Sequence, residues 1–365
     1  MQLKSFFKNN IMMLTAAVVA AVTVIFVPVD SAYAGYFDFK TLSCLFCVLA
    51  VVCALRDVNF FYILAQRIVK LFKTTRLCIL ALVYITFIGS MLITNDTALL
   101  TFLPLTYFVL RSTGREDKLC FTFIMQNMAA NLGGMLTPFG NPQNLYLYTK
   151  FGIPTGEFIG IMLPPFLASM LLITVCCLFV KSEPLQLTQE KQEIRVLPTV
   201  LYAALFVLSV CIVLRAIPYW VGLIIIPVVL LVSDRHALKA VDYSLILTFV
   251  FFFIFAGNMA RIPAVREFLS ALLQQNTLLY SALSCQLISN VPAAILLSQF
   301  TSDYANLLVG VNIGGAGTLI ASLASLITFN QYRRHQPEGT RKFILSFTAY
   351  NFAFLAILIL LMSII

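Results

Sequence analysis

The chain has 365 residues, of which 61% are hydrophobic and only 11% are charged. Soluble domains carry about 25% charged residues, so this composition excludes a soluble enzyme and indicates a protein with many membrane spans. The formal net charge of +9 is what basic cytoplasmic loops produce, so we expect a lipid bilayer around the chain and no nucleic acid partner.

Nine apolar runs are long enough to cross a bilayer. In chain order they are residues 11–29, 41–55, 119–148, 157–180, 196–214, 218–232, 244–257, 304–329 and 343–365. The first run could belong to a signal peptide, because Ala32, Tyr33 and Ala34 resemble a cleavage site. Its length favours a retained first helix. Two further apolar stretches, residues 77–110 and 278–300, are broken in the middle by polar residues.

The basic residues predict the orientation of these spans. With the N-terminus in the cytoplasm and nine crossings, every Lys and Arg falls inside except Lys40, Lys150, Arg215, Arg261 and Arg266. This holds only if residues 77–110 leave the cytoplasm and return to it, as a helical hairpin. Each limb has about 16 residues, or roughly 24 Å of helix, which fits either a re-entrant loop or a nearly full hairpin.

The two halves of the chain share a repeated pattern. The segment LITNDTALLTFLPL at 92–105 matches LISNVPAAILLSQF at 287–300, which pairs Asn95 with Asn290. Downstream, NLGGMLT at 131–137 matches NIGGAGT at 312–318, which pairs Asn131 with Asn312. The first hairpin is predicted to open to the cytoplasm and the second to the outside. Such an inverted repeat with broken helices is the sequence signature of a secondary transporter.

We therefore predict an all-α polytopic membrane protein with about nine transmembrane helices, two helical hairpins and two broken helices. The first inverted repeat covers residues 1–180, with a hairpin at 77–110 that opens to the cytoplasm and a broken helix at 119–148. Residues 181–215 form a cytoplasmic loop and a linker helix. The second repeat covers residues 216–365, with a hairpin at 278–302 that opens to the outside and a broken helix at 304–329.

The residues at the breaks are of the types that start helices. Thr94 and Asn95 are N-cap residues, Ser289 and Asn290 precede a proline, and Thr137-Pro138 and Asn141-Pro142 each place a cap before a proline. Helix N-termini attract anions, whereas unwound carbonyl groups hold cations. A lone Asn or a Gly pair in a membrane usually serves packing, but four such clusters in two matching pairs favour a binding site.

Asp96 is the only acidic residue deep within an apolar region. Intramembrane carboxylates are functional by default. Asp96 either ligates Na+ or binds and releases a proton, since burial favours the neutral form of a carboxyl group. The alternative is a residue that only caps the hairpin turn. Its counterpart in the second half is Val291, so any role of the charge is asymmetric.

The four motifs TNDTALLTFLPL, NLGGMLTPFGNPQNLYLY, SNVPAAILLS and NIGG resemble the ion transporter superfamily, in particular its citrate-transporter-like permeases. That group includes dicarboxylate/sodium symporters, arsenite permeases and sodium/proton antiporters. The resemblance implies a scaffold domain, a transport domain that moves across the membrane, and a homodimer. It also implies that Ser90, with Gly133 or Gly134, is near a bound sodium ion. Asp96 and Val291 stand where the dicarboxylate branch has substrate-binding threonines.

The predicted function is a secondary active transporter of the cytoplasmic membrane. It would move a small anion, a di- or tricarboxylate or an inorganic oxyanion, coupled to Na+ or H+. The alternative is a sodium/proton antiporter or an arsenite efflux permease. No cofactor and no catalytic residue is expected, because no His lies in an apolar run and no metal-protease motif occurs.

Two sets of site residues follow. The substrate-binding set is Asn95, Asp96, Thr97, Thr137, Asn141, Ser289, Asn290, Val291, Pro292 and Thr318. The ion-binding set, at which Na+ is one candidate, is Ser90, Thr94, Asn95, Asp96, Gly133, Gly134, Asn290, Gly314 and Gly315.

Overall fold

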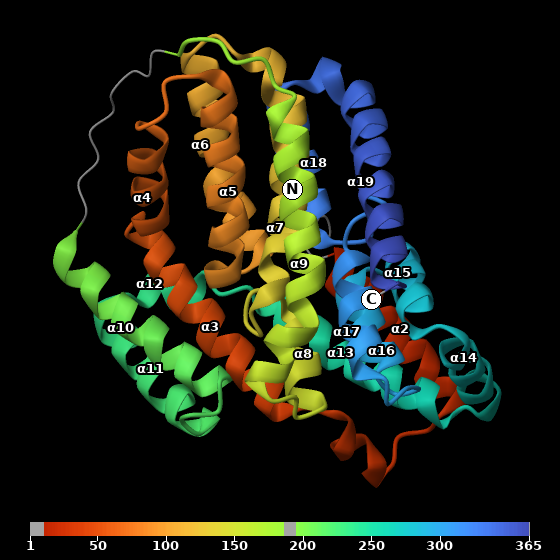
Figure 1. Ribbon diagram of the computed structural model, residues 1–365. Helices are drawn as coiled ribbons and strands as arrows, with labels where there is room; N and C mark the ends of the chain where they lie inside the picture. The colour runs from red at the N-terminus through yellow and green to blue at the C-terminus, as the bar shows by residue number, and fades with distance from the viewer. Residues whose placement is uncertain (1–10, 186–194, 365) are drawn as a thin grey trace.

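The computed structural model describes residues 11–185 and 195–364, and all regular secondary structure in these ranges is helical (Figure 1). Lys4, Lys8 and most of the predicted cytoplasmic loop, residues 186–194, lie outside the described residues. The prediction of an all-helical, multi-pass membrane protein is confirmed. Within the described ranges, six helical segments are long and apolar enough to cross a membrane: Phe39–Asp57, Thr75–Ile93, Thr155–Leu178, Val196–Val213, Arg235–Arg261 and Pro337–Met362.

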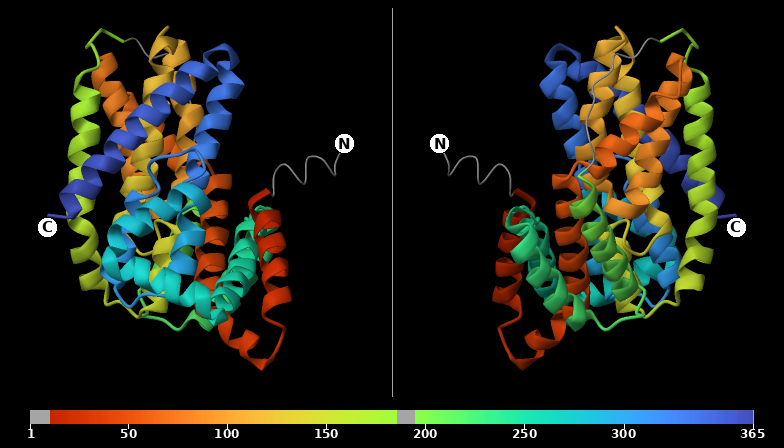
Figure 2. Two further views of the ribbon diagram at one scale, coloured as in Figure 1. Left: turned by 90° about the vertical axis from the view of Figure 1, so that its right-hand side faces the viewer. Right: turned by 90° about the vertical axis from the view of Figure 1, so that its left-hand side faces the viewer.

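One group of helices packs around two of its own members. Its members are α2 (Ile11–Phe26), α3 (Phe39–Asp57), α10 (Val196–Val213), α11 (Tyr219–Ser233), α12 (Arg235–Lys239) and α13 (Tyr243–Arg261). Helix α2 packs against α13, and α10 and α11 pack against α3. Figure 2 shows α2 and α13 on the opposite side of the molecule from α9 (Thr155–Leu178). We call this group the outer layer.

The first hairpin consists of α5 (Thr75–Ile93) and α6 (Asn95–Ser112), separated only by Thr94. Its limbs have 19 and 18 residues, or about 28 Å of helix each. Of the two predicted forms, a re-entrant loop and a nearly full hairpin, these lengths fit the nearly full hairpin. The limbs are longer than predicted because each helix continues beyond its apolar run into polar residues, Thr75 and Arg76 at one end and Arg111 and Ser112 at the other.

The second hairpin is much shorter. Helices α15 (Thr277–Ile288) and α16 (Asn290–Leu297) have 12 and 8 residues, or about 18 and 12 Å, so this hairpin reaches only part of the way across a bilayer. Each hairpin follows a short helix, α4 (Phe60–Val69) in the first half and α14 (Pro263–Gln275) in the second.

Both predicted broken helices are broken. The first consists of α7 (Leu119–Gly133) and α8 (Pro142–Lys150), and the second of α17 (Tyr304–Ile313) and α18 (Leu323–His335). Asn141 is the N-cap of α8 with Pro142 directly after it, as predicted. The prediction that Thr137 starts a helix is wrong, because Thr137 lies in the unwound segment between α7 and α8. Helix α19 (Thr340–Met362) ends the fold.

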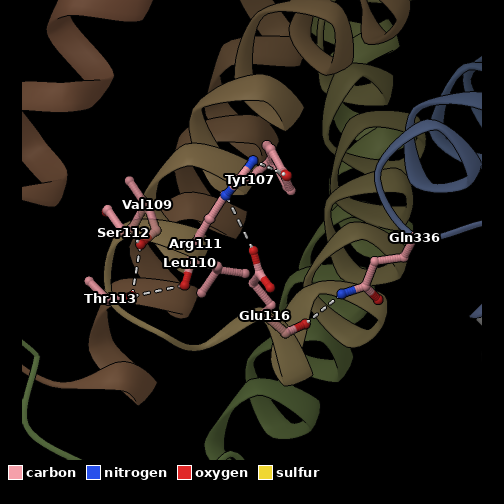
Figure 3. Close-up of polar contacts among 8 residues, drawn as sticks. All are labelled: Tyr107, Val109, Leu110, Arg111, Ser112, Thr113, Glu116 and Gln336. Atoms are coloured by element: carbon pink, nitrogen blue, oxygen red, sulfur yellow. Dashed lines mark hydrogen bonds and ion pairs between the residues drawn. The ribbon is translucent and has the colours of Figure 1, made fainter.

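Polar contacts join the first hairpin to the second broken helix at the predicted cytoplasmic end (Figure 3). Arg111 at the end of α6 donates to the Tyr107 hydroxyl at 2.8 Å and lies 3.7 Å from the Glu116 carboxylate. The Gln336 side chain, just past α18, donates to the Glu116 carbonyl at 3.3 Å. These contacts hold α6 beside α18, and both helices begin at the candidate site.

Candidate functional site

The two hairpin tips have the same backbone geometry. Thr94 has φ 69° and ψ 151°, and Ser289 has φ 71° and ψ 157°. Positive φ is unfavourable for residues other than glycine and persists only where the surroundings impose it. The next residue of each tip supplies the constraint: the Asn95 N–H donates to the Gly140 carbonyl at 3.2 Å, and the Asn290 N–H donates to the Ala321 carbonyl at 2.9 Å. Each tip is thus attached to the broken helix of its own half.

The side chains of the paired asparagines complete the same turn in each tip. Asn95 Oδ1 accepts from the Asp96 N–H at 2.9 Å, and Asn290 Oδ1 accepts from the Val291 N–H at 2.9 Å. Each amide therefore satisfies one of the free N–H groups at the start of its helix. In the first tip, the Thr94 hydroxyl also donates to the Thr97 hydroxyl at 3.2 Å.

Asn131, at the end of α7, connects the first tip to the second broken helix. Its Oδ1 accepts from Asn95 Nδ2 at 3.2 Å and from Ser322 Oγ at 2.7 Å. Ser322 is the N-cap of α18. A single buried carbonyl oxygen therefore joins three segments that are far apart in the sequence.

Asn312, the counterpart of Asn131, makes the reverse connection. Its Oδ1 accepts from Asn141 Nδ2 and Gln143 Nε2, both at 3.2 Å, and its Nδ2 donates to Asn144 Oδ1 at 2.6 Å. These three partners lie at the start of α8 in the first half. Each repeated asparagine thus holds a helix N-terminus of the opposite half.

A small cavity lies where these segments meet. It is lined by Asn95 and Asp96 of α6, Pro142 and Gln143 of α8, Ser289, Asn290 and Val291 at the second tip, Ser322 and Leu323 at the start of α18, and Met12 and Leu245 of the outer layer. Its volume is about 10 Å³, which is room for about one water molecule. The N-termini of α6, α8, α16 and α18 all reach it, so four positive dipole ends converge on one point.

The cavity is electrostatically unusual because Asp96 is the one ionisable residue among its lining residues, which include no Lys, Arg or His. Within the described part of the chain, four buried atoms in or beside the cavity have no hydrogen-bond partner: Asp96 Oδ1, Asn131 Nδ2, Asn141 Oδ1 and Gln143 Oε1. Unpaired buried polar atoms are costly, so these atoms call for a ligand. Three of the four are acceptors, which suit a hydrogen-bond donor or a cation.

Five predicted substrate-binding residues line the cavity, namely Asn95, Asp96, Ser289, Asn290 and Val291. The other five do not. Thr97 and Pro292 lie farther along α6 and α16, and Asn141 binds Asn312 instead. Thr137 and Thr318 donate through their hydroxyls to the carbonyls of Met91 and Gln286, at 2.7 and 3.2 Å, and so attach the unwound segments to the hairpins.

The predicted ion-binding residues of the first half lie close together behind the first tip. Ser90 Oγ donates to the Phe87 carbonyl at 2.8 Å. A Cβ on Gly133 would overlap that carbonyl, and one on Gly134 would lie 2.5 Å from Asn141 Oδ1. Gly133 therefore permits the close approach of α7 to α5, and Gly134 permits the close approach of Gly140 and Asn141. The role of these glycines in ion binding stays a prediction.

Sequence reasoning missed Pro142, Gln143, Ser322, Leu323, Met12 and Leu245 as lining residues. A signal for Ser322 was present, because Ser322 follows Asn312 at the same spacing as Asn141 follows Asn131. Extending the repeat by a few residues would have found it. Met12 and Leu245 carried no signal, since each is an apolar residue in an apolar helix.

Comparisons with known proteins place the chain in a family. The model of the citrate transporter family matches residues 6–306. An uncharacterized transporter of Methanocaldococcus jannaschii is 36% identical over 80% of this chain and 80% of its own length. The inner membrane protein YbiR of Escherichia coli is 30% identical over 74% of this chain and 73% of its own.

A silicon efflux transporter of rice, Oryza sativa subsp. japonica, is 31% identical over 39% of this chain, which corresponds to 28% of its own length. This match covers only part of both proteins.

Proposed function

Because the chain belongs to the citrate transporter family, we propose that it is a secondary active transporter that carries a small oxygen-rich solute in the cavity between its hairpin tips, with Asp96 as the proton-carrying group. The observation that carries the proposal is Asp96 itself: a carboxylate at the meeting point of four helix N-termini, with Oδ1 buried and without a partner. The name of the Escherichia coli relative supports a location in the cytoplasmic membrane.

We propose further that residues 1–180 and 216–365 are inverted repeats that alternate access to this cavity. The equal backbone angles of Thr94 and Ser289 and the reciprocal contacts of Asn131 and Asn312 support this proposal. In this arrangement the outer layer is the scaffold, and a homodimer would form through it.

The chemistry of the cavity makes proton and solute binding interdependent. Four helix N-termini favour an anion, and an ionised Asp96 offsets them. Protonation at Asp96 removes that negative charge and leaves a site that suits an oxyanion. Proton and anion then bind together and leave together, which is symport. The cavity holds only about one water molecule, so any solute enters only after lining residues such as Met12 and Leu245 withdraw, and a small inorganic oxyanion needs less of this movement than a tricarboxylate.

A second candidate solute is an undissociated oxyacid. The unpartnered acceptors Asp96 Oδ1 and Gln143 Oε1 would accept hydrogen bonds from its hydroxyl groups, and no basic side chain is needed among the lining residues. The partial match to a silicon efflux transporter fits this candidate. Here the solute and the proton compete for Asp96, so the coupling would be antiport.

Purified protein in liposomes tests the function and separates the two candidates. A thermal-shift screen of carboxylates, sulfate, phosphate, arsenite and silicic acid, with and without Na+, identifies the solute, because a ligand of the folded state raises its apparent stability. A pH-sensitive dye inside the vesicles then records proton movement. Proton entry with the solute supports an anion symporter, and proton exit during solute entry supports the oxyacid exchanger. Solute flux driven by a sodium gradient alone would refute the proton-coupled transporter.

A further inference from the structure

Gln286, on the second hairpin, fills the break between α17 and α18. Its Nε2 donates to the carbonyls of Gly314 at 2.8 Å and Ala316 at 3.1 Å, and to Ala282 of its own helix at 3.0 Å. Its Oε1 accepts from the Thr318 N–H at 2.9 Å. The side chain therefore satisfies both carbonyl and N–H groups of the unwound segment.

These contacts fix the orientation of the amide. The end that faces Gly314 and Ala316 meets only carbonyl oxygens and must donate, whereas the end that faces Thr318 meets an N–H and must accept. Gly317 closes the remaining space, because it has φ +131° and a Cβ there would overlap the Gln286 side chain. The segment is built around this amide.

The same carbonyl groups are those that a sodium ion would need. Unwound carbonyls of broken helices coordinate Na+ in transporters, and the sequence predicts an ion at Gly314 and Gly315. In the structure, the Gly314 carbonyl instead faces an NH2 group, which carries partial positive charge and supplies two hydrogens. A sodium ion does not fit beside it, because the three carbonyl oxygens already surround the nitrogen.

In the first half, too, a side-chain amide satisfies the carbonyl groups of the break. There the carbonyls of Gly134, Met135 and Thr137 accept from Asn144 Nδ2 at 3.4, 3.1 and 3.2 Å. The residue that corresponds to Gln286 is Met91, which has no donor group. The donor therefore comes from α8 in the first half and from the hairpin in the second.

We propose that Gln286 takes the place of a cation in the second break, so that residues 314–318 bind no Na+. The proposal makes the second half of the site independent of sodium, and any coupling cation is then confined to the first half. It concerns cation occupancy alone and is tested without a transported solute, so its failure and that of the proposed function are separate.

The substitution Gln286→Glu tests whether a cation can occupy the second break. One carboxylate oxygen keeps the Thr318 N–H, and the other then faces the carbonyls of Gly314 and Ala316, which repel it unless a cation lies between them. Gln299→Glu is the matched control, because Gln299 follows α16 and donates to the Tyr146 hydroxyl at 3.3 Å, away from the break.

Thermal unfolding of the purified full chain is measured in sodium chloride and in choline chloride at equal ionic strength. We expect Gln286→Glu to unfold at lower temperature in choline than the wild type and to gain a saturable rise in Tm of about 2–4 °C in sodium. The wild type and Gln299→Glu should lack this added rise. The proposal is overturned if sodium raises the Tm of Gln286→Glu no more than that of the wild type. It is also overturned if the wild type shows such a rise and Gln286→Glu loses it.

A measurement on the unmodified protein covers the case in which Gln286→Glu does not accumulate. Equilibrium binding of radioactive sodium to the purified wild type should show at most one ion per chain. Two saturable sodium sites per chain would contradict the proposal.

Discussion

Replacing Asn131 with alanine removes a side chain that connects the first hairpin tip to the start of α18. Its Oδ1 accepts from Asn95 Nδ2 and Ser322 Oγ, at 3.2 and 2.7 Å. Two buried hydrogen bonds at about 0.5–1.5 kcal/mol each give a loss of about 1–3 kcal/mol. For a chain of 365 residues, that corresponds to a fall in Tm of about 1–4 °C. If the connection is needed for the bound geometry, the same free energy weakens solute binding by about 5- to 150-fold.

Asn127→Ala is the matched control, because it should lower stability without changing the geometry of the site. Asn127 lies one turn earlier on α7 and also makes two contacts with α18: it accepts from Thr328 Oγ1 at 3.1 Å and donates to Ser325 Oγ at 3.4 Å. It touches neither hairpin tip through these bonds. We expect a similar loss of stability in both variants, with transport impaired only in Asn131→Ala.

The assay is initial uptake by liposomes at several solute concentrations, with the amount of inserted protein measured in the same vesicles. Tm is recorded by intrinsic fluorescence in detergent. The reasoning is refuted if Asn131→Ala has the half-saturating concentration of the wild type, or if Asn127→Ala loses solute affinity to the same degree.

Two further predictions concern packing and pH. Gly133→Ala places a methyl group against the Phe87 carbonyl and should cost about 1–3 kcal/mol in unfolding measurements, whereas Gly160→Ala, which meets open space, should be neutral. A hydrogen bond from Arg261 holds the pKa of the exposed Asp30 carboxyl below its ordinary value, so this pair contributes stability above about pH 4 that is lost as pH falls through the lowered pKa. Arg261→Gln should therefore be less stable than the wild type at neutral pH and equally stable in acid; a constant difference in Tm across pH would contradict this.

Much of the fold could be predicted because a polar residue in an apolar run has few explanations. The tips fall at Thr94 and Ser289 and the breaks follow Gly133 and Ile313, which is where the repeated motifs placed them. Hairpin length was harder to predict, since apolar runs report the part of a helix in hydrocarbon and not its ends. The first hairpin is therefore longer than its apolar run.

The site was only half predictable for a different reason. Residues at the tips, such as Asn95 and Asn290, are marked by their own sequence context. Gln143 and Gln286 act through contacts with segments distant in the sequence, and their amides resemble the interhelical hydrogen bonds common in membrane proteins. Their roles become visible only when the opposite break is placed beside them.

Proton-driven accumulation by Asp96→Asn tests the central claim most directly. Solute uptake by liposomes is measured in two modes, as accumulation driven by a pH gradient and as exchange at equal solute concentration and equal pH. Asp303→Asn is the control, because it makes the same substitution at the N-cap of α17, where the carboxylate accepts from the Asn306 N–H and side-chain amide.

We predict that Asp96→Asn loses accumulation and keeps exchange, because the amide preserves the shape of the cavity and cannot carry a proton. Asp303→Asn should retain both modes. If Asp96→Asn still accumulates solute against its gradient at the wild-type level, then the carboxylate between the hairpin tips does not carry the proton, and the proposed coupling is wrong.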